Sequence, residues 1–180
     1  MKGYNILLGI FSLIMILSAE PVAAQPAGTA QAATAQECQL IKETDPYTKL
    51  TRISSGFMEL SGASVTVDAD KKEIDLLFSI PNDRCFDDES AAMIYFAGTK
   101  LKLSLRNAGT MNCEGLFHFI FRNGTSVNYQ LKKLATMKVN QIVFTDRNKK
   151  EIEVNLSPAA QEAFQRAVKC VSEEAVKLLQ

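Results

Sequence analysis

The chain has 180 residues, enough for one domain, and its 20 Lys and Arg residues balance 20 Asp and Glu residues, with a single His. This balance lacks the excess of positive charge that nucleic-acid-binding and membrane-surface proteins use, so neither class is expected. A hydrophobic share of 47% against 22% charged residues also excludes a chain that stays unfolded.

Residues 1–24 have the pattern of a secretory signal peptide. A basic start precedes an apolar run from Ile6 to Leu17, and small residues lead to a cleavage position before Gln25. The run is shorter than the about 20 residues that cross a bilayer, so we expect cleavage and no membrane insertion of the mature chain. The protein is therefore predicted to be exported, into a periplasm or outside the cell.

The mature chain is predicted to begin with a flexible linker. Residues 25–36 contain only Ala, Gln, Thr, Gly and Pro, which offer little apolar surface to offset the entropy lost on ordering. Residues 37–180 are then long enough for one exported domain with a single core.

Alternation of apolar and polar residues predicts that this domain consists largely of half-buried antiparallel strands. The expected strands cover residues 64–67, 74–80, 93–96, 100–106, 116–122, 125–131, 139–145 and 151–156. Asn123-Gly124 predicts a tight hairpin that returns through 125–131, because both turn positions favour positive φ. Residues 132–138 fit either a short helical turn or a loop.

The carboxy terminus has the signals of an amphipathic helix. Ser157 is suited to the N-cap and Pro158 to the first turn. Apolar residues follow at helical spacing, and Lys169, Glu173 and Lys177 form an expected ladder on the opposite side. The predicted fold class is α+β, an antiparallel meander of about seven or eight strands covered by this helix.

Four cysteines in an exported chain predict two disulfides. A zinc site is less suitable because no CxxC pair occurs and only one His is present. In a meander the loops 81–91 and 107–114 share one end of the sheet, which favours a Cys85–Cys113 pair. Cys38 would then pair with Cys170, although two other connectivities stay open.

An acidic cluster in the first of these loops is the strongest candidate for a ligand site. It consists of Asp83, Asp87, Asp88 and Glu89. Several loop carboxylates suit calcium, yet the Gly and Glu spacing of an EF-hand is missing. Asp residues that cap backbone groups in a solvated turn are the alternative. No other cofactor is expected.

The remaining candidates have structural explanations. His118 lies in the middle of a predicted strand with no sequence signature for a nucleophile or an orienting carboxylate, so a packed structural His is expected. Two charged stripes, one basic and one acidic, fit the solvent-exposed face of a sheet as cross-strand neighbours. The basic stripe alternatively offers a surface for an anionic glycan or an acidic partner. The stripes are Lys100, Lys102 and Arg106, and Glu151 and Glu153.

The aromatic residues are interpreted as core and not as a platform for sugars, since they alternate with polar residues and Trp is absent. They are Phe57, Tyr95, Phe117, Phe119, Phe121 and Tyr129.

Taken together, these patterns predict a non-enzymatic exported protein that binds an unknown protein or glycan partner, with the loops at the Cys85/Cys113 end as the working surface. A small hydrolase that uses carboxylates of the acidic loop is one alternative. A structural protein that assembles through an edge strand is another.

Overall fold

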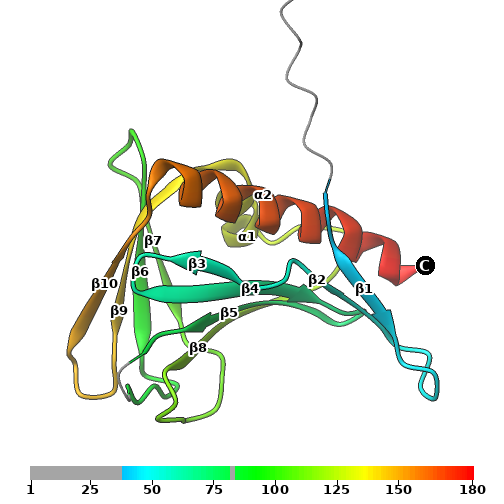
Figure 1. The fold of residues 1–180 in the computed structure, drawn as a ribbon, viewed down its shortest axis with the longest axis horizontal. Helices are drawn as coiled ribbons and strands as arrows, with labels where there is room; N and C mark the ends of the chain where they lie inside the picture. Colours follow the sequence, from blue (N-terminus) through cyan, green and yellow to red (C-terminus); the bar gives the residue numbers. More distant parts are fainter. Residues whose placement is uncertain (1–37, 82–83) are drawn as a thin grey trace, which may run out of the picture. The chain divides into compact units, whose positions relative to one another are not determined.

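The computed structural model describes residues 38–81 and 84–180, so the expected signal peptide and linker lie outside the described residues. In this part of the chain the strands form two antiparallel sheets (Figure 1). The six-stranded sheet contains β1 (Ile41–Thr44), β2 (Thr51–Ser54), β3 (Met58–Leu60), β4 (Ala63–Ala69), β5 (Glu73–Ser79) and β8 (Leu116–Arg122). The four-stranded sheet contains β6 (Ala91–Phe96), β7 (Lys102–Arg106), β9 (Val139–Thr145) and β10 (Glu151–Asn155).

The order of the strands within the sheets differs from their order in the sequence. The larger sheet runs β1-β2-β4-β5-β8, with β3 also paired to β4, and the smaller sheet runs β10-β9-β6-β7. The α+β class, the antiparallel strands and the covering helix are confirmed. The strands are divided between two sheets because β5 pairs with β8. The two strands between them in the sequence, β6 and β7, belong to the four-stranded sheet.

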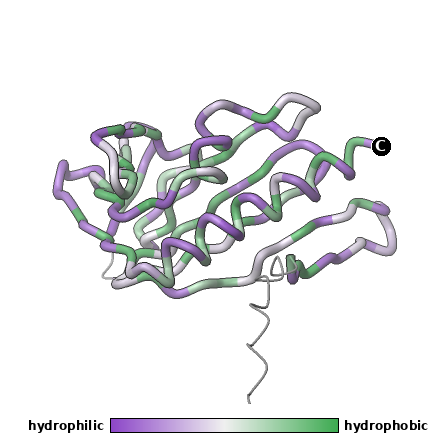
Figure 2. Tube along the Cα trace, turned by 90° about the horizontal axis from the view of Figure 1, so that it is seen from above, coloured by the Kyte–Doolittle hydropathy of each residue, from purple (hydrophilic) through white to green (hydrophobic). Residues whose placement is uncertain are grey.

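Helix α2 (Pro158–Ala175) begins as predicted, with the Ser157 hydroxyl accepting a hydrogen bond from the Ala160 amide at 3.2 Å. Polar and apolar residues alternate along it (Figure 2), and the apolar side packs against both sheets. The predicted charge ladder is only partly formed, because Lys177 pairs with Glu174. Neither of the helices in the described residues is long and apolar enough to span a membrane.

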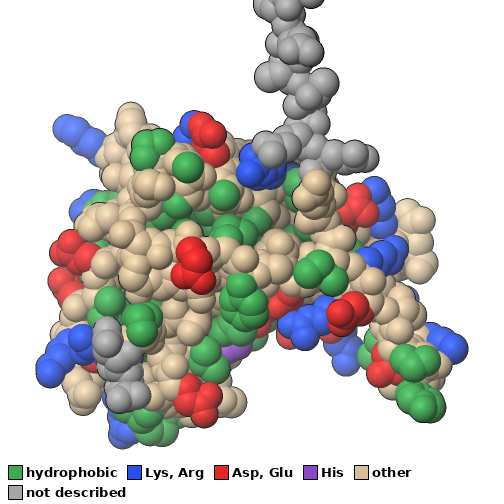
Figure 3. Space-filling model, viewed as in Figure 1, with side chains coloured by type: hydrophobic (Ala, Val, Ile, Leu, Met, Phe, Trp, Pro, Cys, Tyr) green, Lys and Arg blue, Asp and Glu red, His purple; other side chains and the backbone are tan. Residues whose placement is uncertain are grey.

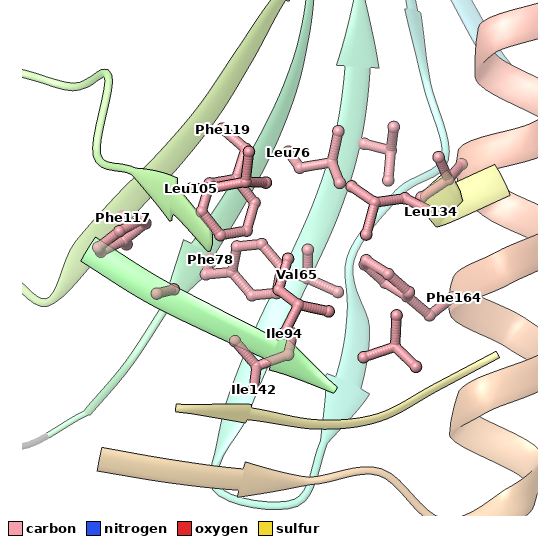
Figure 4. Packing of buried hydrophobic residues seen from close by; sticks show 14 of the residues in the cluster. Val65, Leu76, Phe78, Ile94, Leu105, Phe117, Phe119, Leu134, Ile142 and Phe164 are labelled. Atoms are coloured by element: carbon pink, nitrogen blue, oxygen red, sulfur yellow. The ribbon is translucent and has the colours of Figure 1, made fainter. Parts of the chain in front are cut away.

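The core lies between the two sheets and α2, and aromatic rings hold its centre. Phe78 of β5 lies 5.3 Å from Phe144 of β9 and 6.1 Å from Phe164 of α2, measured between ring centroids. All three side chains are fully buried, and Figure 4 shows Phe78 and Phe164 among aliphatic side chains from the strands. Burial of each ring stabilises the fold by about 1.5–3 kcal/mol.

The hairpin predicted at Asn123-Gly124 is wrong. Asn123 is 5% exposed, and its side-chain amide donates hydrogen bonds to the carbonyl oxygens of Asp70 at 2.9 Å and Ala175 at 2.8 Å. These contacts tie the end of β8 to the β4–β5 turn and to the end of α2. The predicted strand 125–131 is replaced by a loop and the start of α1 (Tyr129–Thr136), because buried tertiary hydrogen bonds outweigh a local turn preference.

Two disulfides brace the domain, joining Cys38 to Cys170 and Cys85 to Cys113. These are the pairs favoured on topological grounds, although the path of the chain differs from a meander. The first joins the segment before β1 to α2. The second joins the loops before β6 and β8, which also exchange backbone hydrogen bonds between Phe86 and Asn112 at 2.9 and 3.0 Å.

We expect the two disulfides to contribute unequally to stability. Their bonded cysteines are 132 and 28 positions apart, and loop-closure entropy assigns about 5 and about 3.5 kcal/mol to rings of these sizes. Denaturant unfolding of Cys38→Ser/Cys170→Ser and of Cys85→Ser/Cys113→Ser should therefore show the larger loss of unfolding free energy for the first variant. An equal or larger loss for the second would contradict this account.

Candidate functional site

The acidic loop uses its best-placed carboxylate to hold its own backbone. Asp87 Oδ1 accepts hydrogen bonds from the amides of Glu89 at 3.1 Å and Ser90 at 3.0 Å. The Ser90 hydroxyl also donates to it at 2.9 Å, and this bond is the main reason why the pKa of Asp87 is lowered. Arg147 Nε lies 3.6 Å from Oδ2. Asp87 therefore has the capping role that the sequence offered as the alternative.

Neither of the other described acidic residues of this loop, Asp88 and Glu89, extends the cluster. Glu89 Oε2 lies 3.6 Å from Lys149 Nζ, Asp88 is exposed, and Asp83 lies outside the described residues. Across residues 38–81 and 84–180, no three Asp, Glu, His or Cys side chains gather where they could hold a metal ion. The calcium site stays a prediction.

The two charged stripes are not neighbours. Strand β7, which carries Lys102 and Arg106, and strand β10, which carries Glu151 and Glu153, lie at opposite edges of the four-stranded sheet. The expectation of cross-strand pairing between the stripes is therefore wrong. Lys102 instead places Nζ 5.0 Å from the centre of the Tyr95 ring. Glu153 accepts a hydrogen bond from Gln141 at 3.1 Å.

A hollow lies on the outer face of the six-stranded sheet, the face that turns away from α2. Figure 3 shows the surface hollowed on its lower side, next to the β1–β2 hairpin at the right. The volume is about 320 Å³. We call it the sheet hollow, and its lining includes Ile41, Arg52, Phe57, Thr66, Asp68 and Leu77.

The apolar part of the sheet hollow is exposed to solvent. Phe57 is 68% exposed and Ile41 is 53% exposed, and both line the hollow beside Leu77 of β5. The assignment of Phe57 to the core is therefore wrong, as is that of Tyr129, which is also 68% exposed, whereas Phe117, Phe119 and Phe121 are buried as expected.

One extra residue in the chain between β2 and β3 explains why this phenylalanine ring faces outward. Ser54 of β2 lies opposite Asp68 of β4, and Met58 of β3 lies opposite Val65 of β4. The chain therefore advances four residues from Ser54 to Met58 while β4 advances three. Gly56 takes up the extra residue with a φ of +69°, the left-handed conformation of a glycine bulge. The bulge turns the following ring out of the inward alternation.

Hydrogen-bonded polar groups form the floor of the sheet hollow. Arg52 Nη2 donates to Asp68 Oδ2 at 2.8 Å, and the side chains of these residues are 64% and 10% exposed. Thr66 Oγ1 lies 3.4 Å from Asp68 Oδ1 and 3.3 Å from Ser54 Oγ. The floor is therefore ordered before any ligand arrives.

Next to this floor, Asp75 of β5 pairs with His118 of β8. Oδ2 of Asp75 lies 2.8 Å from His118 Nδ1, and both side chains are 23% exposed. The other oxygen of Asp75 is buried and meets no donor among the described residues. The hydrogen bond to Asp75 is the main cause that raises the pKa of His118, with further help from the charges of Asp75 and Glu73 and against partial burial.

The sequence did not reveal this pair because the two residues are 43 positions apart. They meet through the β5–β8 register, in which Leu77 lies opposite His118 and Asp75 opposite Ile120. The outward positions of each strand could be recognised from alternation, but the pairing of these two strands could not. In the described part of the chain, no Ser, Thr or Cys hydrogen-bonds to the remaining nitrogen of His118. The pair therefore lacks the neighbouring nucleophile that a Ser–His or Cys–His arrangement requires.

The outer face of the six-stranded sheet thus combines an exposed apolar patch, an ordered polar floor and the Asp75–His118 pair. Comparisons of the chain with known protein families, curated proteins and solved structures gave no match.

We expect the Asp75–His118 pair to stabilise the protein most at mildly acidic pH. The pKa of His118 lies above its ordinary value of 6.5, so the contribution is complete below 6.5 and disappears as the pH rises through the raised pKa. The unfolding free energy of the wild type should exceed that of His118→Gln most at pH 5.5, and the difference should shrink toward pH 8.5. A difference that grows with pH would refute this.

Gly109 should control the position of the imidazole. A Cβ at this position would lie 2.5 Å from His118 Cδ2, closer than atoms can pack, so Gly109→Ala should displace the ring from Asp75. NMR titration of the imidazole should then give a lower pKa than in the wild type. Gly124→Ala is the matched control, because its Cβ meets nothing closer than 4.0 Å. An unchanged titration in Gly109→Ala would mean that the contact does not hold the ring.

Proposed function

We propose that this chain is an exported, non-enzymatic binding protein whose binding surface is the sheet hollow. The observation that carries the proposal is the exposure of Phe57 and Ile41, 68% and 53%, in a concavity with an ordered polar floor. The signal-peptide pattern and the two disulfides support export, since such bonds persist in oxidising compartments.

The physical argument for binding is the removal of apolar surface from water. A ligand that covers an exposed aromatic ring gains about 25 cal/mol for each Å² of apolar surface buried. The Arg52–Asp68 pair beside the ring supplies polar groups that are already positioned, so they can orient a ligand at a small entropic cost.

This surface replaces the loops at the Cys85/Cys113 end as the proposed working region. Backbone groups of those loops already have partners within the domain. Phe86 and Asn112 exchange hydrogen bonds between the two loops, and the Arg147 amide, from the β9–β10 turn, donates to the Cys85 carbonyl at 3.0 Å. The sheet hollow instead offers exposed apolar side chains.

The two alternative functions receive less support. A hydrolase based on the acidic loop needs a carboxyl with a raised pKa, whereas the pKa of Asp87 is lowered. Assembly through an edge strand is opposed by charged residues along the edges, such as Lys42 and Glu43 on β1 and Glu151 and Glu153 on β10.

Replacement of Phe57 should weaken binding at the sheet hollow without affecting the fold. In heteronuclear NMR titrations with benzyl alcohol, a neutral aromatic probe, we expect amide shifts on β2 and β4 and a loss of affinity of about fivefold in Phe57→Ala, as expected when an aromatic contact is removed. Tyr129→Ala is the matched control, because Tyr129 is equally exposed at 68% but lies on α1. The proposal fails if the two variants weaken binding equally, or if neither does.

A further inference from the structure

The outer face of the six-stranded sheet is acidic although the chain as a whole is neutral. Alternate positions of its strands point to this face, and the register of the sheet identifies them. The carboxylates at these positions are Glu43, Glu59, Asp68, Glu73 and Asp75. The guanidinium groups at these positions are those of Arg52 and Arg122, and His118 adds positive charge when it is protonated.

The acidic groups form a second hollow that continues the first. It has a volume of about 250 Å³ and is lined by residues that include Asp70, Glu73 and Asp75. Arg52 and Asp68 line both hollows. The surface is therefore continuous, with Phe57 and Ile41 at one part and carboxylates at the other.

The carboxylates in this second hollow repel one another. Asp68 of β4 lies directly opposite Asp75 of β5 in the register, and like charges at such positions are destabilising. Arg52 neutralises the first and protonated His118 the second. Glu73 lies opposite Arg122 across β5 and β8, but Asp70 adds a further negative charge beside it. A positive charge brought by a ligand would offset the remaining repulsion.

We propose that this surface binds an extended peptide segment in which Lys or Arg lies close to an apolar side chain. The apolar side chain packs on Phe57 and Ile41, and the cation lies among Asp70, Glu73 and Asp75. Same-side residues of an extended segment are about 6.4–6.8 Å apart, which suits two adjoining hollows. The proposal rests on the binding function proposed above and adds the chemistry of the ligand.

Two peptides of opposite charge test the ligand class. An acetylated and amidated Lys-Ser-Leu-Ser-Lys peptide, which carries Lys and Leu on the same side of an extended segment, should bind the full mature protein, whereas the matching Glu-Ser-Leu-Ser-Glu peptide should bind at least tenfold more weakly, because charge complementarity discriminates against the wrong partner. Affinity for the first should fall with added salt. Glu43→Gln/Glu73→Gln should reduce it by about fivefold, as expected for two exposed ion pairs. The control Glu151→Gln removes an equally exposed carboxylate from the edge of the other sheet and should leave the affinity unchanged.

Each other outcome overturns a defined part of the proposal. If the Glu peptide binds as well as the Lys peptide and Phe57→Ala weakens both, the sheet hollow binds ligands but the cationic class is wrong. If neither peptide binds, but benzyl alcohol still binds the wild type more tightly than Phe57→Ala, the peptide proposal fails and the binding surface stands. If Phe57→Ala changes no binding at all, both proposals fail. Self-association of the protein that Phe57→Ala abolishes would identify a second copy of the chain as the occupant.

Discussion

The pairing of β5 with β8 is the constraint on which both faces of the larger sheet depend. Seven residues of each strand lie in register, from Glu73 opposite Arg122 to Ser79 opposite Leu116. On the inner face this register places Phe78 beside Phe117 within the core. On the outer face the same register brings Asp75 to His118. A shift by one residue would exchange the two faces, so the core packing that fixes the register also fixes the charged pair.

Much of the fold could be predicted because every second residue of these strands is a large apolar one and the start of α2 is encoded locally by Ser157 and Pro158. The exceptions arise where distant parts of the chain meet. Asn123 has the strongest local turn signal, but its amide is used by backbone carbonyls about 50 positions away. The outward position of Phe57 depends on a bulge against β4, which a single strand cannot reveal. The candidate site could not be predicted for the same reason, since its residues come from four strands.

The outer face of the six-stranded sheet combines groups that do little for the stability of the isolated domain. Arg52 is 64% exposed, and an ion pair with so much contact with water contributes at most about 1 kcal/mol. The buried oxygen of Asp75 without a donor costs free energy, and the exposed ring of Phe57 leaves apolar surface in water. The aromatic core and two disulfides supply the stability that lets the domain keep these groups. Such local costs are typical of surfaces that act on other molecules.

The Cys38–Cys170 disulfide also has a consequence for the order of biogenesis. In a chain exported with its amino terminus first, Cys38 reaches the oxidising compartment while its partner, 132 positions behind, is still inside. Cys85 and Cys113 arrive as a nearby pair and can close first. Until the last turns of α2 emerge, Cys38 is a thiol that can exchange with the bond already formed. With the export proposed above, oxidative folding would proceed through a species that holds the short ring alone, and it would end when the carboxy-terminal helix brings Cys170 to Cys38.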